Sequence, residues 1–206
     1  IREVEGSALT VKVPAGCRLD VDAVAASIEV SGLTGRLELE SVSGDVTVRG
    51  RPAALDADTV SGDLEVEAAP TGCQLESVSG DVTVSSATGS IEASSVSGDV
   101  VVAGGVLERA ELQTTSGNLR LAADLRGPGP FELESMSGAV VLEVPAAVVA
   151  SFELETFSGE IDSALGPKPG RASEHGPGQE LEFSTGSGGP RVSASSFSGT
   201  VTLTTR

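Results

Sequence analysis

Four aspartates follow Ser-Gly pairs at a constant spacing of 18 residues, and they are the residues of this chain most able to do chemistry. They are Asp45, Asp63, Asp81 and Asp99. A row of carboxylates offers the oxygen ligands that Ca²⁺ prefers, which makes these four residues candidate calcium ligands. The calcium-binding nonapeptide roll, however, uses a GGxGxD turn, whereas these turns hold only Ser-Gly-Asp. The alternative to calcium binding is that each aspartate is a turn residue on an acidic edge exposed to solvent.

The elements that position these aspartates are repeats. SVSGDV occupies residues 41–46 and returns at 77–82 and 95–100, with the near-copy TVSGDL at 59–64. The serines of the Ser-Gly pairs are Ser43, Ser61, Ser79, Ser97, Ser116, Ser137, Ser158 and Ser198. Their first intervals are 18 residues, followed by 19, 21, 21 and 40. A period near 20 residues is typical of a solenoid.

Apolar and polar residues alternate within each repeat, which is the period of strands with one buried face. Each repeat predicts two short strands, such as residues 36–40 and 45–48. At the turn between them, we expect Val42 and Val46 to point inward, Gly44 to permit the bend, and Ser43 and Asp45 to accept backbone hydrogen bonds.

Parallel stacking of these repeats, about 4.8 Å apart, would build a continuous narrow core. The fold class predicted is therefore all-β: a single-domain parallel β-helix, or β-solenoid, with about 18 to 21 residues per coil and a right-handed winding.

The domain organisation follows from the same pattern. We expect one domain over residues 1–206, with an N-terminal capping strand at 1–16 and regular coils at 17–163. A Pro/Gly-rich loop with a partial coil follows at 164–190, and the last coil lies at 191–206.

Two further acidic columns are expected on the outside of the coils. One contains Glu38, Asp56 and Glu92, and its neighbour contains Glu40, Asp58 and Glu76. Paired carboxylates also serve glycoside hydrolases, but here nearly every acid belongs to a repeating column, and no known catalytic motif is present. We therefore predict no enzyme, no catalytic residue and no cofactor.

The net charge and a few single residues limit which partners and which sites can be expected. The formal charge of −17 disfavours nucleic acid and anionic membranes, and no apolar run is long enough for a transmembrane segment. His175 lies in the Pro/Gly-rich loop, where we expect it to be exposed to solvent. Cys17 and Cys73 lie three coils apart in a stacked solenoid, about 14 Å, so we predict no disulfide and a buried free thiol at Cys73.

The motifs also resemble a family. The chain has Val13-Pro14-Ala15-Gly16 after a strand pattern, then reiterated Ser-x-Ser-Gly-Asp-Val-x-Val, a Gly-rich break, and the closing run Ser198-Gly-Thr-Val-Thr-Leu203. This order resembles the bacterial adhesin-type domain of unknown function. The resemblance implies a parallel β-helix, attachment to the cell envelope or an extracellular location, and a binding role, with no catalytic residues to carry over.

Two functional classes remain open at this stage. The first is an adhesin-like binding or scaffold module that uses a strand face or the 164–190 loop to hold a protein or envelope ligand. The second is a structural β-helix that self-associates into oligomers or filaments. A calcium-binding repeat roll is the third, weaker alternative.

Overall fold

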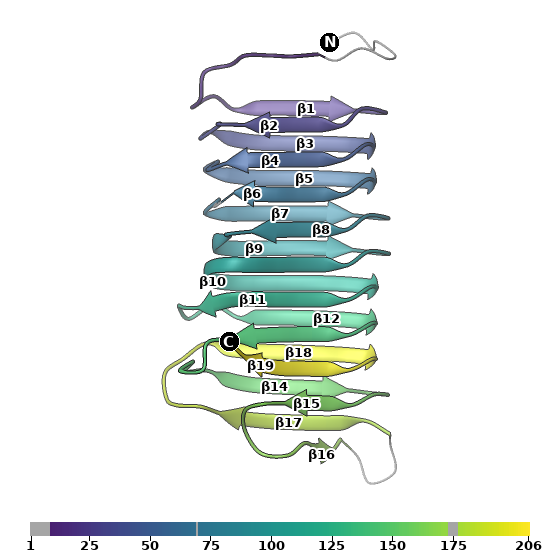
Figure 1. Cartoon of the computed structure of the whole chain (residues 1–206), viewed down its shortest axis with the longest axis vertical. Coiled ribbons are helices and arrows are strands. Elements are labelled where there is room, and N and C mark those ends of the chain that lie inside the picture. Colours follow the sequence, from purple (N-terminus) through teal and green to yellow (C-terminus); the bar gives the residue numbers. More distant parts are fainter. Residues whose placement is uncertain (1–8, 69, 173–176) are drawn as a thin grey trace.

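The computed structural model describes residues 9–68, 70–172 and 177–206, and these residues form a rod of stacked β-strands (Figure 1). Each coil contributes two strands, one to each of two faces. Neighbouring coils pair in parallel at the predicted spacing, so that Leu37 lies opposite Leu55 and Val46 opposite Leu64. The predicted all-β solenoid is confirmed.

The strands divide between two faces of the rod. The first face holds β1 (Leu19–Ala23), β3 (Arg36–Ser43), β5 (Ala54–Ser61), β7 (Gly72–Ser77), β9 (Thr88–Ser95), β12 (Phe131–Ser137), β14 (Ser151–Thr156) and β18 (Arg191–Ser198). The second face holds β2 (Ile28–Ser31), β4 (Val46–Gly50), β6 (Leu64–Ala68), β8 (Val82–Ser85), β11 (Leu119–Leu125), β13 (Val140–Val144), β15 (Ile161–Ser163) and β19 (Val201–Thr205). The long strand β10 (Val100–Ser116) serves both, because its start pairs with β8 and β11 and its end with β9 and β12.

The core lies between the two faces and is built from in-register columns. One column runs Leu37, Leu55, Cys73, Ile91, Ala110, Phe131, Val192 and Phe152, each residue opposite the next. All of these side chains are buried, as the alternation predicts. Stacking of like residues thus gives one continuous apolar core along the rod.

The coil at residues 191–206 does not occupy the end of the rod. Strand β18 pairs with β12 on one side and with β14 on the other, so the C-terminal coil lies between two coils that precede it in the sequence (Figure 1). The coil predicted as the last one therefore lies inside the stack, and the coils do not stack in the order of the sequence. The inserted Val192 separates Phe131 from Phe152, whose ring stacks instead on Phe183 with centroids 5.1 Å apart.

The two ends of the rod differ. At the end of the rod beyond β14, β17 (Gln179–Ser184) pairs antiparallel with β14, and β16 (Gly170–Arg171) pairs with β17. These strands occupy the region predicted as a loop with a partial coil. At the other end, residues 9–16 contain no strand, and Leu9, Val11 and Val13 are exposed. The predicted capping strand is therefore wrong over 9–16, while residues 1–8 lie outside the described residues.

The described part of the chain contains no helix with the length and hydropathy needed to cross a bilayer. The sequence likewise predicts no transmembrane segment.

Candidate functional site

A column of hydroxyl side chains is buried at the corner of the first face. Its members are Ser41, Thr59, Ser77, Ser95, Thr114, Ser135, Thr156 and Ser196. Most donate to a glycine carbonyl: the Ser95 hydroxyl lies 3.1 Å from the Gly80 oxygen, and the Ser196 hydroxyl lies 2.9 Å from the Gly138 oxygen. These bonds satisfy corner carbonyls that the strand ladder leaves free. We call this row the hydroxyl floor.

The residues directly after the hydroxyl floor point outward, against the sequence prediction. Val42, Val60, Val78 and Val96 are between 46% and 49% exposed. The alternation of inward and outward residues continues through the corner, so Ser41 takes the inner place and Val42 the outer one. The corner is narrow and rich in carbonyl groups, which suits a small hydroxyl better than a valine.

These outward residues form a continuous apolar ridge along the rod. It contains Val24, Val42, Val60, Val78, Val96, Thr115, Met136, Phe197 and Phe157, named in their order in the stack. Its far end is aromatic, because the rings of Phe157 and Phe197 stack with centroids 4.7 Å apart. We call this row the apolar ridge. An exposed apolar stripe of this length is unusual on a soluble surface and is typical of a contact site.

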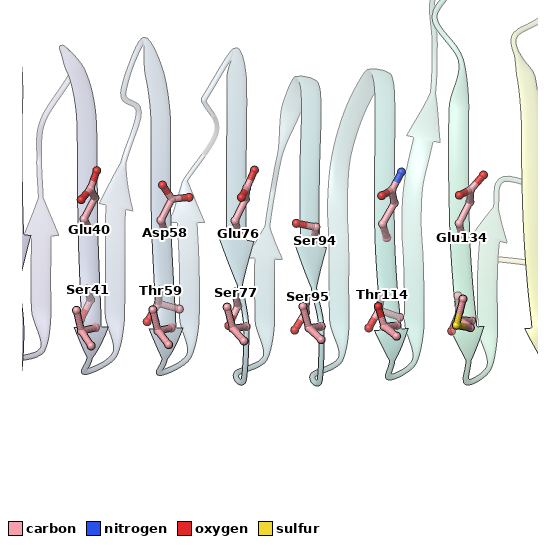
Figure 2. A pocket seen from close by; sticks show the side chains of 18 of the residues that line it. Glu40, Ser41, Asp58, Thr59, Glu76, Ser77, Ser94, Ser95, Thr114 and Glu134 are labelled. Carbon is pink, nitrogen blue, oxygen red and sulfur yellow. The ribbon is translucent and has the colours of Figure 1, made fainter.

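An acidic column borders the hydroxyl floor on its other side. It contains Asp22, Glu40, Asp58 and Glu76, continues through Ser94 and Gln113, and regains a carboxylate at Glu134. Figure 2 shows the carboxylates of Glu40, Asp58, Glu76 and Glu134 in one row, and floor residues from Ser41 to Thr114 in a second row beside the turns. We call it the inner acidic column. It points outward, as the sequence predicts.

The inner acidic column, the hydroxyl floor and the apolar ridge together enclose a groove of about 1000 Å³. The groove runs from the coil of β1 to the coil of β18, which is roughly 34 Å at the spacing of parallel strands. A site for a small molecule gathers such a volume into a compact cavity. This groove is long and open instead, so its shape suits an extended chain.

A second acidic column on the same face lies further from the groove and is partly neutralised. Arg18 pairs with Glu38, and Arg191 pairs with Glu153. Arg109 also lies 3.1 Å from Glu111. Arginines therefore pair with this second acidic column at intervals along the rod.

The calcium candidates Asp45, Asp63, Asp81 and Asp99 form a hydrogen-bond ladder at the corner. The Asp45 Oδ1 accepts from the Asp63 backbone N–H at 3.1 Å, and the Asp63 Oδ1 accepts from the Asp81 N–H at 2.9 Å. The pattern continues from Asp81 to Asp99 and from Asp99 to Asn118.

This ladder gives each aspartate a structural task. The Asn118 Oδ1 performs it as well, accepting from the Ala139 N–H at 3.0 Å, so the position needs an oxygen acceptor rather than a charge. In the described ranges, no three His, Cys, Asp or Glu side chains are grouped so as to hold a metal ion. The geometry supports the turn role, and calcium binding at these residues stays a prediction. The serine hydroxyl that bonds the corner backbone is that of Ser41, which donates to the Gly44 oxygen at 3.1 Å, whereas the prediction had Ser43 accepting.

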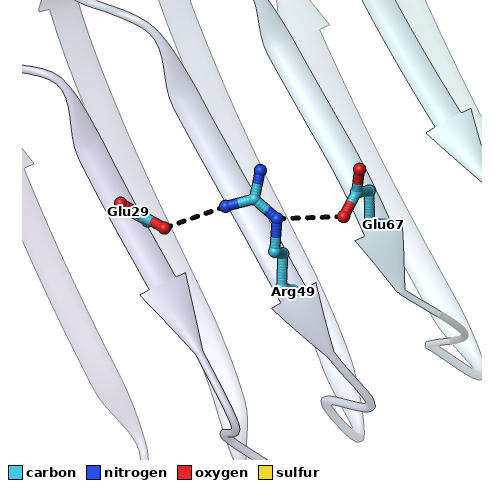
Figure 3. A network of polar contacts seen from close by, with 3 residues as sticks. All are labelled: Glu29, Arg49 and Glu67. Carbon is cyan, nitrogen blue, oxygen red and sulfur yellow. Dashed lines mark hydrogen bonds and ion pairs between the residues drawn. The ribbon is translucent and has the colours of Figure 1, made fainter.

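The second face carries charge that is balanced locally. Arg49 lies between Glu29 and Glu67, at 2.8 Å and 2.9 Å, and links β2, β4 and β6 (Figure 3). These two carboxylates raise the pKa of the Arg49 guanidinium, chiefly through its hydrogen bond to Glu67. This face also has no counterpart to the apolar ridge among its large exposed hydrophobic residues.

Neither of the two cysteines lines the groove. Cys73 is buried and free, as predicted, and burial raises the pKa of its thiol to about 12. Cys17 is half-buried and also free. His175 lies outside the described residues.

Sequence reasoning found the carboxylates of the groove but missed its apolar side, because it assigned the ridge residues to the core. The signal was available in the columns themselves. The position of Ser41 is Ala23 in the coil of β1 and Ser or Thr in the other parallel coils, whereas the position of Val42 also holds Thr115, Met136 and Phe197. Constant small residues fit a tight interior, and variable large ones fit an open surface.

Comparison with known proteins gives one family. The family model described as Toastrack DUF4097 matches residues 11–95 and, in a second overlapping match, residues 73–204. No curated protein matches the chain, and no solved structure matches it. The match therefore covers nearly the whole solenoid but assigns no functional residue.

Proposed function

The chain belongs to the Toastrack DUF4097 family, and we propose that it is a non-catalytic binding module whose ligand site is the groove of the first face. The observation that carries this proposal is the apolar ridge. Solvent-exposed apolar side chains stand one per coil along most of the rod, beside carboxylates that lie outward in the same register. Continuous exposed apolar surface next to polar groups is characteristic of sites for macromolecular partners.

The repetition of the groove favours recognition over catalysis. A catalytic site needs a few unlike groups brought together once, such as a nucleophile and its base. In the groove the same groups recur from coil to coil, so a partner can contact several equivalent positions. We therefore propose an extended partner, held along the rod. An adhesin-like role at the cell envelope or outside the cell is the setting that the resemblance suggests.

Site-specific photo-crosslinking tests this function in the native host. A photoreactive residue at Val60 should crosslink to a discrete protein, whereas the same residue at Glu65 on the second face should not. Excess wild-type protein should compete for the crosslink, and the Val78→Asp variant should not. Equal crosslinking from Val60 and Glu65, or none from Val60, would overturn the proposal.

Self-association is a second candidate function, favoured by the N-terminal end of the rod. Strand β1 pairs only with β3 in the described part of the chain, and its outer edge is left open. Leu9, Val11 and Val13 alternate like a strand and are 70%, 60% and 37% exposed. Open strand edges pair readily with other chains. Sedimentation velocity should show dimers that Val11→Lys abolishes; a monomer at all concentrations would exclude this function.

A further inference from the structure

The inner acidic column lacks the cations that the rest of the surface has. Every ion pair found in the described residues uses a carboxylate outside it. Glu76 has one weak neutral contact, 3.4 Å from the Gln74 amide. Four consecutive coils thus present Asp22, Glu40, Asp58 and Glu76 to solvent without a positive partner.

Partial burial and neighbouring carboxylates both act on Asp58, at the centre of this column. The pKa of Asp58 is raised, first because the side chain is partly buried and then because Asp56, Glu76 and Glu40 carry the same charge. Carboxylates stacked about 4.8 Å apart repel one another. A cation placed beside Asp58 would relieve several of these repulsions at once.

In the same coils, two members of the hydroxyl floor form the bottom of the groove. Thr59 and Ser77 are 4% and 5% exposed, and their hydroxyls have no hydrogen-bond partner among the described residues. Six other floor hydroxyls donate to a glycine carbonyl. Both side chains take the inner place at the corner, like the other members of the row, so they close the bottom of the groove without offering a hydroxyl to a ligand. Thr59 and Ser77 both line the groove, between the column and the ridge.

We propose that the four coils from Asp22 to Val78 bind an extended, cationic and partly apolar peptide segment of a partner protein. Its Lys or Arg side chains would face the inner acidic column, and its apolar side chains would lie on the apolar ridge. This assignment rests on the proposed function, because it names the partner class for the same groove.

Charge decides against the other occupants. Nucleic acid and anionic lipid would bring phosphates onto a row of carboxylates. A second copy of this chain would bring a net charge of −17 against a groove lined by Glu40 and Asp58. A cationic segment is the occupant that meets this acidic side with opposite charge.

The spacing of the coils guides the choice of probe. In the extended polyproline II conformation three residues make one turn of about 9.3 Å, so every third side chain lies on the same side, and two coils span about 9.6 Å. A peptide of three lysine-leucine-serine repeats therefore presents a cation at every second coil. Controls are three glutamate-leucine-serine repeats and three lysine-serine-serine repeats, each labelled with fluorescein for anisotropy.

The expected result depends on both sides of the groove. The lysine-leucine-serine peptide should bind the full chain at low salt, and the glutamate peptide should not. The double variant Asp58→Asn with Glu76→Gln should weaken binding about fivefold or more. The matched variant Glu29→Gln with Glu65→Gln removes the same charge from the second face and should change affinity less than about twofold.

A third variant separates docking in the groove from general charge attraction. Val60→Ser with Val78→Ser should weaken the lysine-leucine-serine peptide but leave the lysine-serine-serine peptide unchanged. Thermal melts monitor folding, and Asp22→Asn with Glu40→Gln replaces any acidic variant that unfolds. Equal loss in groove and second-face variants, or equal binding of the two lysine peptides, would overturn the assignment.

Failure here remains distinguishable from failure of the proposed function. If the Val60 crosslink forms in the host while no lysine peptide binds, the groove is a binding site and its partner is not cationic. If neither occurs, both proposals fail.

Discussion

The rings of Phe157 and Phe197 stack with centroids 4.7 Å apart and planes inclined by 5°, although 40 residues separate them in the chain. The contact exists because β18 pairs directly with β14. Met136, on the coil of β12, lies on the far side of Phe197 from Phe157. The C-terminal coil therefore joins the coil of β14, near the end of the rod, to the coil of β12.

This order can be tested with engineered disulfides in a Cys17→Ser, Cys73→Ser background. Adjacent coils place equivalent residues about 4.8 Å apart, within the range of a disulfide, and alternate coils about 9.6 Å apart, beyond it. Phe157→Cys with Phe197→Cys should crosslink on mild oxidation, and Met136→Cys with Phe157→Cys should not. Non-reducing mass spectrometry reads the outcome, and the reverse pattern would show stacking in chain order.

The sequence predicts the shape of a coil better than the order of the coils. The core positions Leu37 and Leu39 follow from a period of two, which any strand with one buried face must show. The neighbour of a coil does not follow from this period, because every coil presents the same alternating face; Val192 lies between Phe131 and Phe152 although it follows both in the sequence. The interval of 40 residues before Ser198 marked the place of the irregularity without revealing its form.

The groove divides in the same way between what the pattern predicts and what it does not. Glu40 and Asp58 were recognisable as an outward column, because carboxylates rarely enter a core. Val42 was misplaced, because an apolar residue beside a turn fits a core or an exposed ridge equally well by composition. The deciding factor is that the alternation continues through the corner, which the small side chains at the position of Ser41 already indicated and the burial pattern of β3 confirms.

The aspartate ladder predicts a difference between losing charge and losing an acceptor. Asp63→Ala removes the oxygen that accepts from the Asp81 N–H, and we expect it to lower the free energy of unfolding by about 1 kcal/mol. Asp63→Asn keeps an oxygen, as Asn118 does naturally, and should lie within about 0.5 kcal/mol of wild type. Urea unfolding measures both. Equal loss in the two variants would mean that the charge, through bound cations, is what stabilises the corner.

The glycines of the Ser-Gly pairs predict a steric effect at the corner. A Cβ on Gly98 would lie 2.1 Å from the Gly80 carbonyl oxygen of the neighbouring coil, so the two coils would have to separate. Gly98→Ala should cost about 1 to 3 kcal/mol or more, as overpacking does. Gly16 has nothing within 4 Å of such a Cβ, and Gly16→Ala is the matched control with an expected change near zero. Thermal melts compare them; an unchanged Gly98→Ala protein would contradict the close stacking.

The inner acidic column predicts an unusual dependence of stability on pH. Because the pKa of Asp58 is raised in the folded state above its ordinary 3.8, its ionised form destabilises the fold at neutral pH. That penalty disappears as the pH falls through the folded pKa toward 3.8. Asp58→Asn should therefore melt at a higher temperature than wild type at pH 7, with the advantage vanishing near pH 4.

Asp124 provides the contrast, because its carboxylate is paired with Arg206. Asp124→Asn should not raise the melting temperature at pH 7. Should Asp58→Asn lower it as well, repulsion within the column would not be the dominant effect at Asp58.

The two thiols should differ sharply in reactivity. Burial raises the pKa of the Cys73 thiol to about 12, so almost none of it is thiolate at pH 8, and the side chain is only 6% exposed. Cys17 is half-buried at the N-terminal end of the rod. Iodoacetamide at pH 8 should alkylate Cys17 in the native protein and both residues in denaturant, as peptide mass mapping would show. Rapid native labelling of Cys73 would mean that the coil of β7 opens on the timescale of the reaction.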